Sequence, residues 1–328
     1  MENQNKKIKT SKLESLVSDG WGKVAILIDS NDKSLSFIEI LEVLKNNNIE
    51  VGVIEILNQG LNLLERSIWK DFSRVFIAIN SDHKLSFGYI QGLLDILCLE
   101  YTGSGMLAAA LAGDIIKSKK IWQIMGISTT PFIRFHANLD LNEMISLIGF
   151  PLAVKSIYLN DKRVFKVLHM EQLKEVFKNF ENSNEVIIEP WIAGDEYIVH
   201  IIDTKALLPL KVSNWLMIEP TSGSQHDLQK HNQLLNIKGM QQLAMDAFMA
   251  LGCSGFAAVH ILKDLNGDCW VLSINTAPIL TPNSNFATAA YNSSINFETL
   301  VEKVLTSSLI KKSYVLQDGK ANSTATGG

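Results

Sequence analysis

The sequence predicts a soluble α/β protein built from three α/β units. Short apolar runs alternate with segments of helical spacing, and this alternation is typical of a largely parallel sheet with crossover helices. With 328 residues, the chain is long enough for two or three domains. Hydrophobic residues make up 47% and charged residues 20%, so the chain can bury a large core and does not resemble a disordered protein.

Composition excludes several classes of function. The 30 Lys and Arg residues against 34 Asp and Glu residues give a net charge of -4, which argues against nucleic acid as a partner. The apolar runs fall short of the roughly 20 residues that cross a bilayer, so no membrane insertion is expected. The N-terminal residues are basic and polar, without the apolar stretch of a secretory signal. We therefore expect a cytoplasmic protein.

The first unit reads as an open β-sheet with helices. Residues 23–28, KVAILI, are continuously apolar, as expected for a strand buried on both faces. Phe37, Ile40, Leu41 and Leu44 recur at helical spacing and predict an amphipathic helix. In order, the expected elements are a strand at 23–28, a helix at 36–45, strands at 50–57 and 74–79, and a helix at 88–100.

The remaining two units follow a long helical pattern over residues 106–127. In the last unit, Asn266-Gly267 separates two strand-like runs and is a strong hairpin signal. The further expected strands are 150–157, 164–168, 185–192, 196–203, 256–264 and 269–275, and the further helices are 170–180, 239–252 and 296–305.

These elements suggest where the units begin and end. Both chain ends lack apolar periodicity and are expected to be flexible tails. The proposed division is a tail at 1–22, an N-terminal domain at 23–104, a central domain at 105–190, a C-terminal domain at 191–310 and a tail at 311–328.

Four ordered stretches carry a resemblance to a known family. They are 101–127 (YTGSGMLAAALAGD with SKKIWQIMGI), 150–155 (FPLAVK), 186–197 (VIIEPWIAGDEY) and 251–284. Together they resemble the D-alanine–D-alanine ligases of the ATP-grasp superfamily, over nearly the whole of residues 23–305. The resemblance implies a three-domain ATP-grasp architecture, with an N-terminal open-sheet α/β domain and two α+β domains. It also implies that ATP and D-alanine form an acyl phosphate, which the amine of a second D-alanine attacks.

The resemblance further implies that the nucleotide lies between two antiparallel sheets and that Mg²⁺ bridges its phosphates to acidic side chains. Lys155 matches a lysine that contacts phosphate, and Glu196 matches the carboxylate that binds the ribose hydroxyls. Asn275 matches an amide ligand of magnesium, and Ser284 a hydroxyl that binds the second D-alanine. The residues that match the adenine pocket are Glu189, Pro190, Trp191, Ile192 and Leu272.

The departures from the family pattern fall on the groups that perform chemistry. The family's R-x-D strand motif reads Ala258-Val259-His260 here, so the arginine and the first magnesium carboxylate are replaced. Ser273 stands where the second magnesium carboxylate is expected. A hard cation that prefers oxygen ligands is poorly served by imidazole and hydroxyl groups. We therefore expect magnesium binding to be severely weakened.

Other expected features are also missing. Residues 156–166 lack the glycines that bring backbone N–H groups over phosphates, although Lys162 and Arg163 offer cations there. Asp114 is followed by Ile115 instead of the family's second phosphate lysine, and Lys117 lies on another part of the helix. The substrate loops at 29–33, 80–84 and 214–227 do not match the family pattern.

We interpret the chain as a nucleotide-binding pseudo-ligase connected with peptidoglycan precursor metabolism. ATP is its expected ligand, whereas Mg²⁺ lacks both acidic ligands. One alternative is an active ligase for D-alanine or another amino acid, with His260 and Asp264 or Asp268 recruited for metal. A second alternative is a structural homodimer with an empty cleft, in which helices such as residues 88–100 pack between subunits.

Overall fold

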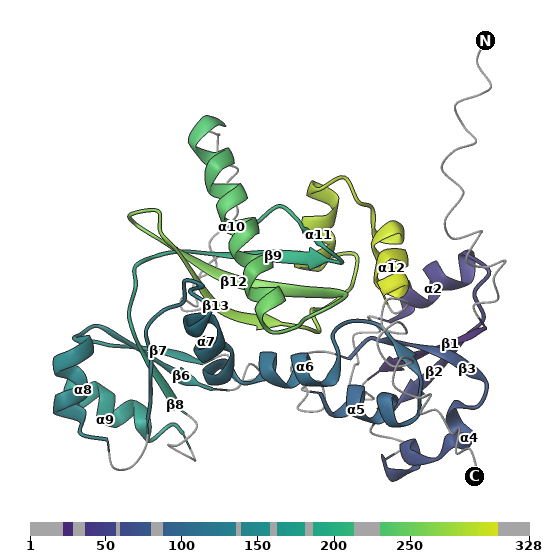
Figure 1. The fold of residues 1–328 in the computed structure, drawn as a ribbon, viewed down its shortest axis with the longest axis horizontal. Helices are drawn as coiled ribbons and strands as arrows, with labels where there is room; N and C mark the ends of the chain where they lie inside the picture. Colours follow the sequence, from purple (N-terminus) through teal and green to yellow (C-terminus); the bar gives the residue numbers. More distant parts are fainter. Residues whose placement is uncertain are drawn as a thin grey trace, which may run out of the picture.

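Three β-sheets with their helices make up the computed structural model (Figure 1). The structure describes residues 22–28, 37–56, 60–79, 88–135, 139–157, 163–180, 186–212 and 230–307.

The first sheet has the order β2-β1-β3-β4, and all its strand pairs are parallel. The strand at 23–28 and the elements expected after it are confirmed, with ends shifted by a few residues. The bounds are β1 Lys23–Ile28, α2 Ile38–Asn46, β2 Val51–Glu55, the 3₁₀ helix η1 Gly60–Leu64, α4 Arg66–Trp69, β3 Phe72–Ile77, α5 Tyr89–Ile96 and β4 Glu100–Tyr101.

The single long helix expected over residues 106–127 is wrong. The chain forms two helices, α6 (Met106–Gly113) and α7 (Ile115–Ile124). Asp114 between them has extended backbone angles, φ -109 and ψ 99, and its side chain accepts a hydrogen bond from the Lys117 backbone N–H. Asp114 is thus the N-cap of α7, a position that Asp favours because its carboxylate accepts from an otherwise unpaired N–H.

The second sheet, with the order β5-β8-β6-β7, is antiparallel throughout. The elements of this unit are β5 Ile133–Arg134, α8 Leu141–Ile148, β6 Leu152–Ser156, β7 Val164–Val167, α9 Met170–Phe177 and β8 Val186–Pro190. The sequence did not indicate β5 or α8. One face of the sheet packs on both helices, and Met144 and Leu173 are buried there.

The third sheet is also antiparallel, with β9 between β10 and β12 and with β13 at the edge. Its elements are β9 Gly194–Ile202, β10 Lys205–Ala206, β11 Leu210–Val212, α10 Lys230–Ala250, β12 Phe256–Asp264, β13 Cys269–Asn275, α11 Asn285–Asn292 and α12 Phe297–Thr306. The hairpin at Asn266-Gly267 is confirmed, with Gly267 at φ +95. The largely parallel sheet predicted from the alternation of elements is therefore found in the first unit alone, and the two antiparallel sheets implied by the resemblance are confirmed in the other two.

A continuous core joins the first and third units. Side chains of β1 and α2 pack with those of α11 and α12 in one cluster, and Figure 1 shows α12 beside α2. At the joint, Ser104 Oγ donates to the Ser254 carbonyl oxygen and accepts from the Ser254 N–H. Gly255 has φ +74, and a Cβ there would come within 2.9 Å of the Gly103 Cα. The two chain segments can approach this closely because Gly255 has no side chain.

A second core cluster fixes one wall of the site. Ala108 and Ala112 of α6 and Trp122 of α7 pack with α10 against the third sheet. The Trp122 indole N–H donates to the Ala247 carbonyl oxygen at 3.0 Å, which ties α7 to α10. The helices before the central sheet thus pack on the C-terminal sheet, and they hold its outer face in place.

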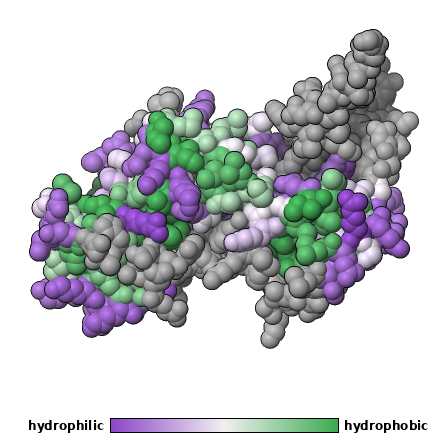
Figure 2. Space-filling view, turned by 60° about the horizontal axis from the view of Figure 1, so that its bottom comes forward, coloured by the Kyte–Doolittle hydropathy of each residue, from purple (hydrophilic) through white to green (hydrophobic). Residues whose placement is uncertain are grey.

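Apolar residues on the face seen in Figure 2 gather in separate clusters with hydrophilic residues around them. The exposed large apolar side chains include Ile96, Leu107 and Ile124. Across the described residues, the helices are too short or too polar to traverse a bilayer.

Candidate functional site

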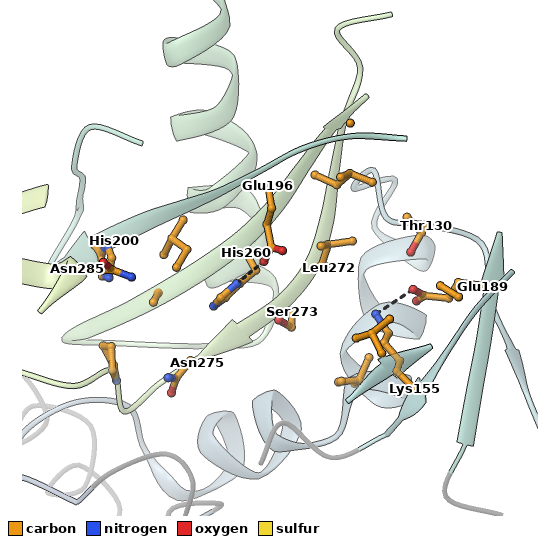
Figure 3. A pocket seen from close by; sticks show the side chains of 18 of the residues that line it. Thr130, Lys155, Glu189, Glu196, His200, His260, Leu272, Ser273, Asn275 and Asn285 are labelled. Atoms are coloured by element: carbon orange, nitrogen blue, oxygen red, sulfur yellow. Dashed lines mark hydrogen bonds and ion pairs between the residues drawn. The ribbon is translucent and has the colours of Figure 1, made fainter. Parts of the chain in front are cut away.

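A cleft of about 820 Å³ lies between the central sheet and the third sheet. Strands β6 and β8 form one side, β9, β12 and β13 form the other, and the segment from Pro278 to Phe286 closes one end. Every site residue expected from the sequence lines this cleft, although many lie far apart in the chain (Figure 3). These residues are Lys155, Glu189, Pro190, Trp191, Ile192, Glu196, Leu272, Asn275 and Ser284, together with the substituted positions Ala258, His260 and Ser273.

Glu189 is the centre of a buried ion cluster on the central sheet. It is 3% exposed, and its two carboxylate oxygens lie 2.8 Å from Lys155 Nζ and 2.9 Å from Lys119 Nζ. Burial alone would raise the pKa of the Glu189 carboxyl, but the two lysines outweigh it and lower the pKa to about 2. The carboxylate is therefore ionised and fixed in direction, as a hydrogen-bond acceptor in the cleft needs to be.

Lys119 completes this cluster, and the sequence analysis did not single it out. Its side chain is fully buried, Nζ donates to Thr129 Oγ1 at 2.8 Å and to Thr130 Oγ1 at 2.6 Å, and it forms an ion pair with Glu189. Burial lowers the pKa of the Lys119 ammonium to about 8, while Glu189 acts in the opposite direction. A signal was available, since Ile115, Lys119 and Trp122 have the spacing of one helix face and two of the three are apolar.

We expect the Glu189 cluster to make the protein sensitive to acid. A carboxyl whose pKa is lowered from 4.5 to about 2 stabilises the fold fully above pH 4.5, and this stabilisation is lost as the pH falls towards 2. Denaturant unfolding at stepped pH should show a falling free energy of unfolding in this range, and Glu189→Gln should show a shallower fall. Glu143→Gln, at an exposed position, is the control, and its free energy of unfolding should depend on pH as in the wild type. If the free energy of unfolding fell equally with pH in the wild type and in Glu189→Gln, the ionised state of Glu189 would not be the source of the acid sensitivity.

The segment after Glu189 crosses from one sheet to the other. The Trp191 N–H donates to the Pro151 carbonyl oxygen at 2.9 Å, which holds the crossing chain against the start of β6. Lys166 Nζ lies 4.9 Å from the centre of the Trp191 ring. Gly194 then enters β9 so close to β12 that a Cβ would lie 2.2 Å from the Lys263 carbonyl oxygen, so a side chain is excluded there.

Glu196 and His260 form a pair on the opposite sheet. Glu196 lies on β9, His260 lies on β12, and His260 Nδ1 is 2.8 Å from Glu196 Oε1 (Figure 3). The residue at the expected metal position therefore bonds to the residue that the resemblance assigns to ribose. One carboxylate oxygen of Glu196 is occupied by this contact.

A β-bulge decides which residues of β13 face the cleft. His260 pairs with Ser273 and Ile261 pairs with Val271, so Leu272 is the extra residue between them. As a result, Leu272 lines the cleft together with Ser273, while Val271 and Ile274 are buried on the other face. Alternation along the strand alone would have placed Leu272 in the core.

Asn275 and Ser284 line the cleft, but both make local hydrogen bonds. Asn275 Oδ1 accepts from the Ala277 N–H at 2.8 Å. Ser284 is the N-cap of α11, where Oγ accepts from the Ala287 N–H and donates to the Thr281 carbonyl oxygen at 2.7 Å. Its hydroxyl proton is thus already used within the loop. The roles predicted for the two residues in binding metal and substrate stay predictions.

Several residues discussed in the sequence analysis do not join the cleft. Lys117 pairs with Asp114 at the start of α7. Arg163 donates to the Asn179 carbonyl oxygen at 3.0 Å and lies over the Phe180 ring. Asp264 accepts from the Asn266 and Asp268 N–H groups in the hairpin turn, away from the cleft lining. Lys162 and the loops at 29–33, 80–84 and 214–227 lie outside the described residues.

The donor groups do not fit a magnesium site. At the positions in question stand a methyl group (Ala258), an imidazole (His260), a hydroxyl (Ser273) and an amide (Asn275). Within the ranges that the structure describes, three or more His, Cys, Asp or Glu residues do not come together in a metal-binding group. Because Mg²⁺ requires near-octahedral oxygen coordination with carboxylate support, the described donors do not supply its site.

Comparison with known proteins identifies what the chain resembles. A family model described as "D-ala D-ala ligase C-terminus" matches residues 121–306. The D-alanine–D-alanine ligase of Psychrobacter sp. (strain PRwf-1) is 30% identical over 305 residues, which cover 88% of this chain and 90% of the relative. The crystal structure of the Bacillus anthracis D-alanine–D-alanine ligase complexed with ATP has a TM-score of 0.76 and 27% identity, covering 88% of this chain and 98% of that chain.

A more distant structure shares the fold. The VanG D-Ala:D-Ser ligase from Enterococcus faecalis has a TM-score of 0.73 at 18% identity, covering 88% of this chain and all of that chain.

Proposed function

Because the chain belongs to the D-alanine–D-alanine ligase family, we propose that it is a pseudo-ligase that binds an adenine nucleotide without normal turnover. We place it in peptidoglycan precursor metabolism, as a partner or regulator of that metabolism. The ATP complex of the Bacillus anthracis relative supports the nucleotide as ligand.

The contact between His260 and Glu196 carries this proposal. In a working site of this type, position 260 would hold a carboxylate towards the metal, but here the imidazole bonds to Glu196 at 2.8 Å. Its cross-strand partner Ser273 is neutral as well. Phosphoryl transfer depends on positioning and on neutralising phosphate charge. Without the two carboxylates and the arginine at position 258, the described residues provide neither the acidic ligands of the metal nor the arginine for that transfer.

The adenosine end of the cleft supports nucleotide binding. Glu189 is held ionised by Lys119 and Lys155, so its carboxylate can accept from the exocyclic amine of adenine. Trp191 and Leu272 supply apolar surface from opposite sides of the cleft. Glu196 keeps one oxygen beyond its contact with His260, which can accept from a ribose hydroxyl.

Calorimetric titration with ATP tests the proposal, first without metal and then with Mg²⁺. We expect ATP to bind weakly, with a dissociation constant that Mg²⁺ changes less than about threefold, because no carboxylate pair holds the ion. Phosphate release with D-alanine should stay at the level of a protein-free control. Robust ATP-dependent phosphate release would refute the proposal and establish the active ligase.

A third outcome addresses the structural alternative. If ATP and adenosine both fail to bind while the protein is folded and dimeric, the chain is a scaffold with an empty cleft. Sedimentation of the same sample gives the oligomeric state directly.

A further inference from the structure

The central sheet is joined to the rest of the molecule by two chain connections. Its four strands all lie between Ile133 and Pro190, so the chain enters this unit once and leaves it once. The first connection, residues 125–132, runs from α7 to β5, and the second, residues 191–193, runs from β8 to β9. Side chains that hold both connections therefore help to set how Glu189, near the end of β8, faces the cleft.

Lys119 on α7 contacts both connections. Its Nζ donates to Thr129 Oγ1 at 2.8 Å and to Thr130 Oγ1 at 2.6 Å, and both threonines belong to the first connection. The same Nζ lies 2.9 Å from Glu189 Oε1, two residues before the second connection begins. Figure 3 places Thr130 and Glu189 at one end of the cleft, which both residues line. One ammonium group thus spans the corner where the two connections meet the cleft.

The first connection and the helix that carries Lys119 are both anchored to the third sheet. Thr129 Oγ1 donates to the Val271 carbonyl oxygen at 2.7 Å, and the Val271 N–H donates to the Ser128 carbonyl oxygen at 2.9 Å. Trp122 ties α7 to α10, which packs on the same sheet. The contact between Lys119 and Glu189 therefore links the central sheet to the wall of the cleft that β9, β12 and β13 form.

The other contact of the Glu189 carboxylate lies within the central sheet. Lys155 is on β6, beside β8, and its Nζ is 2.8 Å from Oε2, whereas Lys119 approaches Oε1. The two ammonium groups thus hold the carboxylate from two sides, one from its own sheet and one from α7. With its pKa lowered to about 2 by these lysines, the carboxylate is ionised at neutral pH and can only accept hydrogen bonds.

We propose that Lys119 is a positioning residue for the adenine end of the cleft. It fixes the direction of the Glu189 carboxylate relative to the third sheet, and the cleft thereby selects a base that offers an amine over a base that offers a carbonyl. The inference rests on the proposed function, because the adenine must lie at Glu189. A fully buried ammonium is costly to maintain, and an apolar side chain would fill the same space without that cost, so the charge serves orientation.

The direction of the carboxylate decides which base is accepted. The exocyclic amine of adenosine donates to a carboxylate oxygen, whereas inosine carries a carbonyl oxygen at the same position, and two acceptors repel one another. A site that holds its acceptor in place rejects the analogue without the donor, because the buried acceptor is then left unpaired. A carboxylate held by Lys155 alone can turn away from the base, so the discrimination between the two nucleosides is expected to fall.

Calorimetric titration of the full chain with adenosine and inosine tests the inference. We expect the wild type to bind adenosine about tenfold more tightly, and Lys119→Met to reduce this advantage to about threefold or less. Lys120→Met, at the exposed neighbouring position of α7, is the matched control and should keep the tenfold advantage. Loss of stability alone weakens the binding of both nucleosides equally and leaves their ratio unchanged. An unchanged ratio in folded Lys119→Met, or equal binding of both nucleosides by the wild type, would overturn the inference.

Thr130→Val provides the same test if Lys119→Met does not fold. The variant removes the hydroxyl that lies 2.6 Å from the Lys119 ammonium and keeps the charge, so the advantage of adenosine should fall by roughly half. If the advantage stayed tenfold in Thr130→Val, the contacts of Lys119 would not orient the carboxylate, and the inference would be refuted.

Hydrogen exchange of the backbone amides tests the same link without a ligand. In Lys119→Met, residues 125–132 and 189–193 should exchange about tenfold faster than in the wild type, whereas Lys120→Met should keep the wild-type rates. Unchanged exchange in both segments would contradict the role of Lys119. If neither nucleoside binds to the wild type, the proposed nucleotide binding is refuted, and the exchange rates then decide whether Lys119 holds the two connections.

Discussion

Replacing His260 with Asp and Ser273 with Glu in the same protein should make ATP binding depend on Mg²⁺, with at least a tenfold tighter dissociation constant when the ion is present. The two positions are cross-strand partners, so their carboxylates would face the cleft side by side, next to the amide of Asn275. Two carboxylates and an amide supply hard oxygen ligands, which Mg²⁺ prefers. The change also frees Glu196 from its contact with the imidazole.

The matched control is His260→Asn with Ser273→Gln, which has the same shape without the charge. Calorimetry should show no magnesium effect in the control and a clear one in the charged variant. Ligation should remain absent, because Ala258 still stands in place of the arginine. If the charged variant bound ATP equally with and without Mg²⁺, the assignment of positions 260 and 273 to the metal shell would be wrong.

The second large effect is expected at Glu189. Glu189→Gln leaves the ammonium groups of Lys119 and Lys155 in the interior without their carboxylate, and removal of one partner from a buried ion pair typically costs 3–5 kcal/mol. The free energy of unfolding, measured by urea denaturation at neutral pH, should fall by about that amount. Adenosine binding should weaken in the same variant.

Lys119→Met removes one of the two positive charges that surround Glu189. Methionine fills similar space, and Glu189 keeps its pair with Lys155, so we expect a loss of stability smaller than that of Glu189→Gln. The hydroxyls of Thr129 and Thr130 lose a donor, which accounts for the remaining cost. If Lys119→Met proved more harmful than Glu189→Gln, the carboxylate would not be the centre of the cluster.

The elements of the fold were largely predictable where local pattern and burial agree. The strand at 23–28 and the Asn266-Gly267 hairpin follow from apolar continuity and turn chemistry, and both are confirmed. The break at Asp114 was not predicted because residues 106–127 have helical composition throughout, and one capping side chain decides the boundary. Whether neighbouring strands run parallel or antiparallel depends on which strands pair. The order of apolar and polar residues does not show this for the second and third sheets.

The site was predictable as a set of residues and less so as a set of contacts. The site residues expected from the resemblance all line one cleft, because the order of the motifs along the chain follows the family. The interaction between His260 and Glu196 joins two strands, and its distance follows from the register of β9 and β12. The orientation of Leu272 depends on a bulge, which the sequence does not mark. His200 also lines the cleft and was not predicted, because its place on β9 follows from the pairing of β9 with β12.

The close approach of Gly103 and Gly255 has a mechanical consequence. Together with the serine contacts beside it and the shared core, it makes the first and third units one rigid block. The central sheet, β5 to β8, joins this block through α7 and through a smaller apolar cluster that includes Ile116 and Ile187. Of the two walls of the cleft, the one formed by β9, β12 and β13 therefore belongs to this block, and we expect the wall that carries Glu189 to move more easily. We expect a ligand that contacts both walls to bring them closer together. Its binding should therefore be measurable as a displacement of the central sheet relative to the other two units.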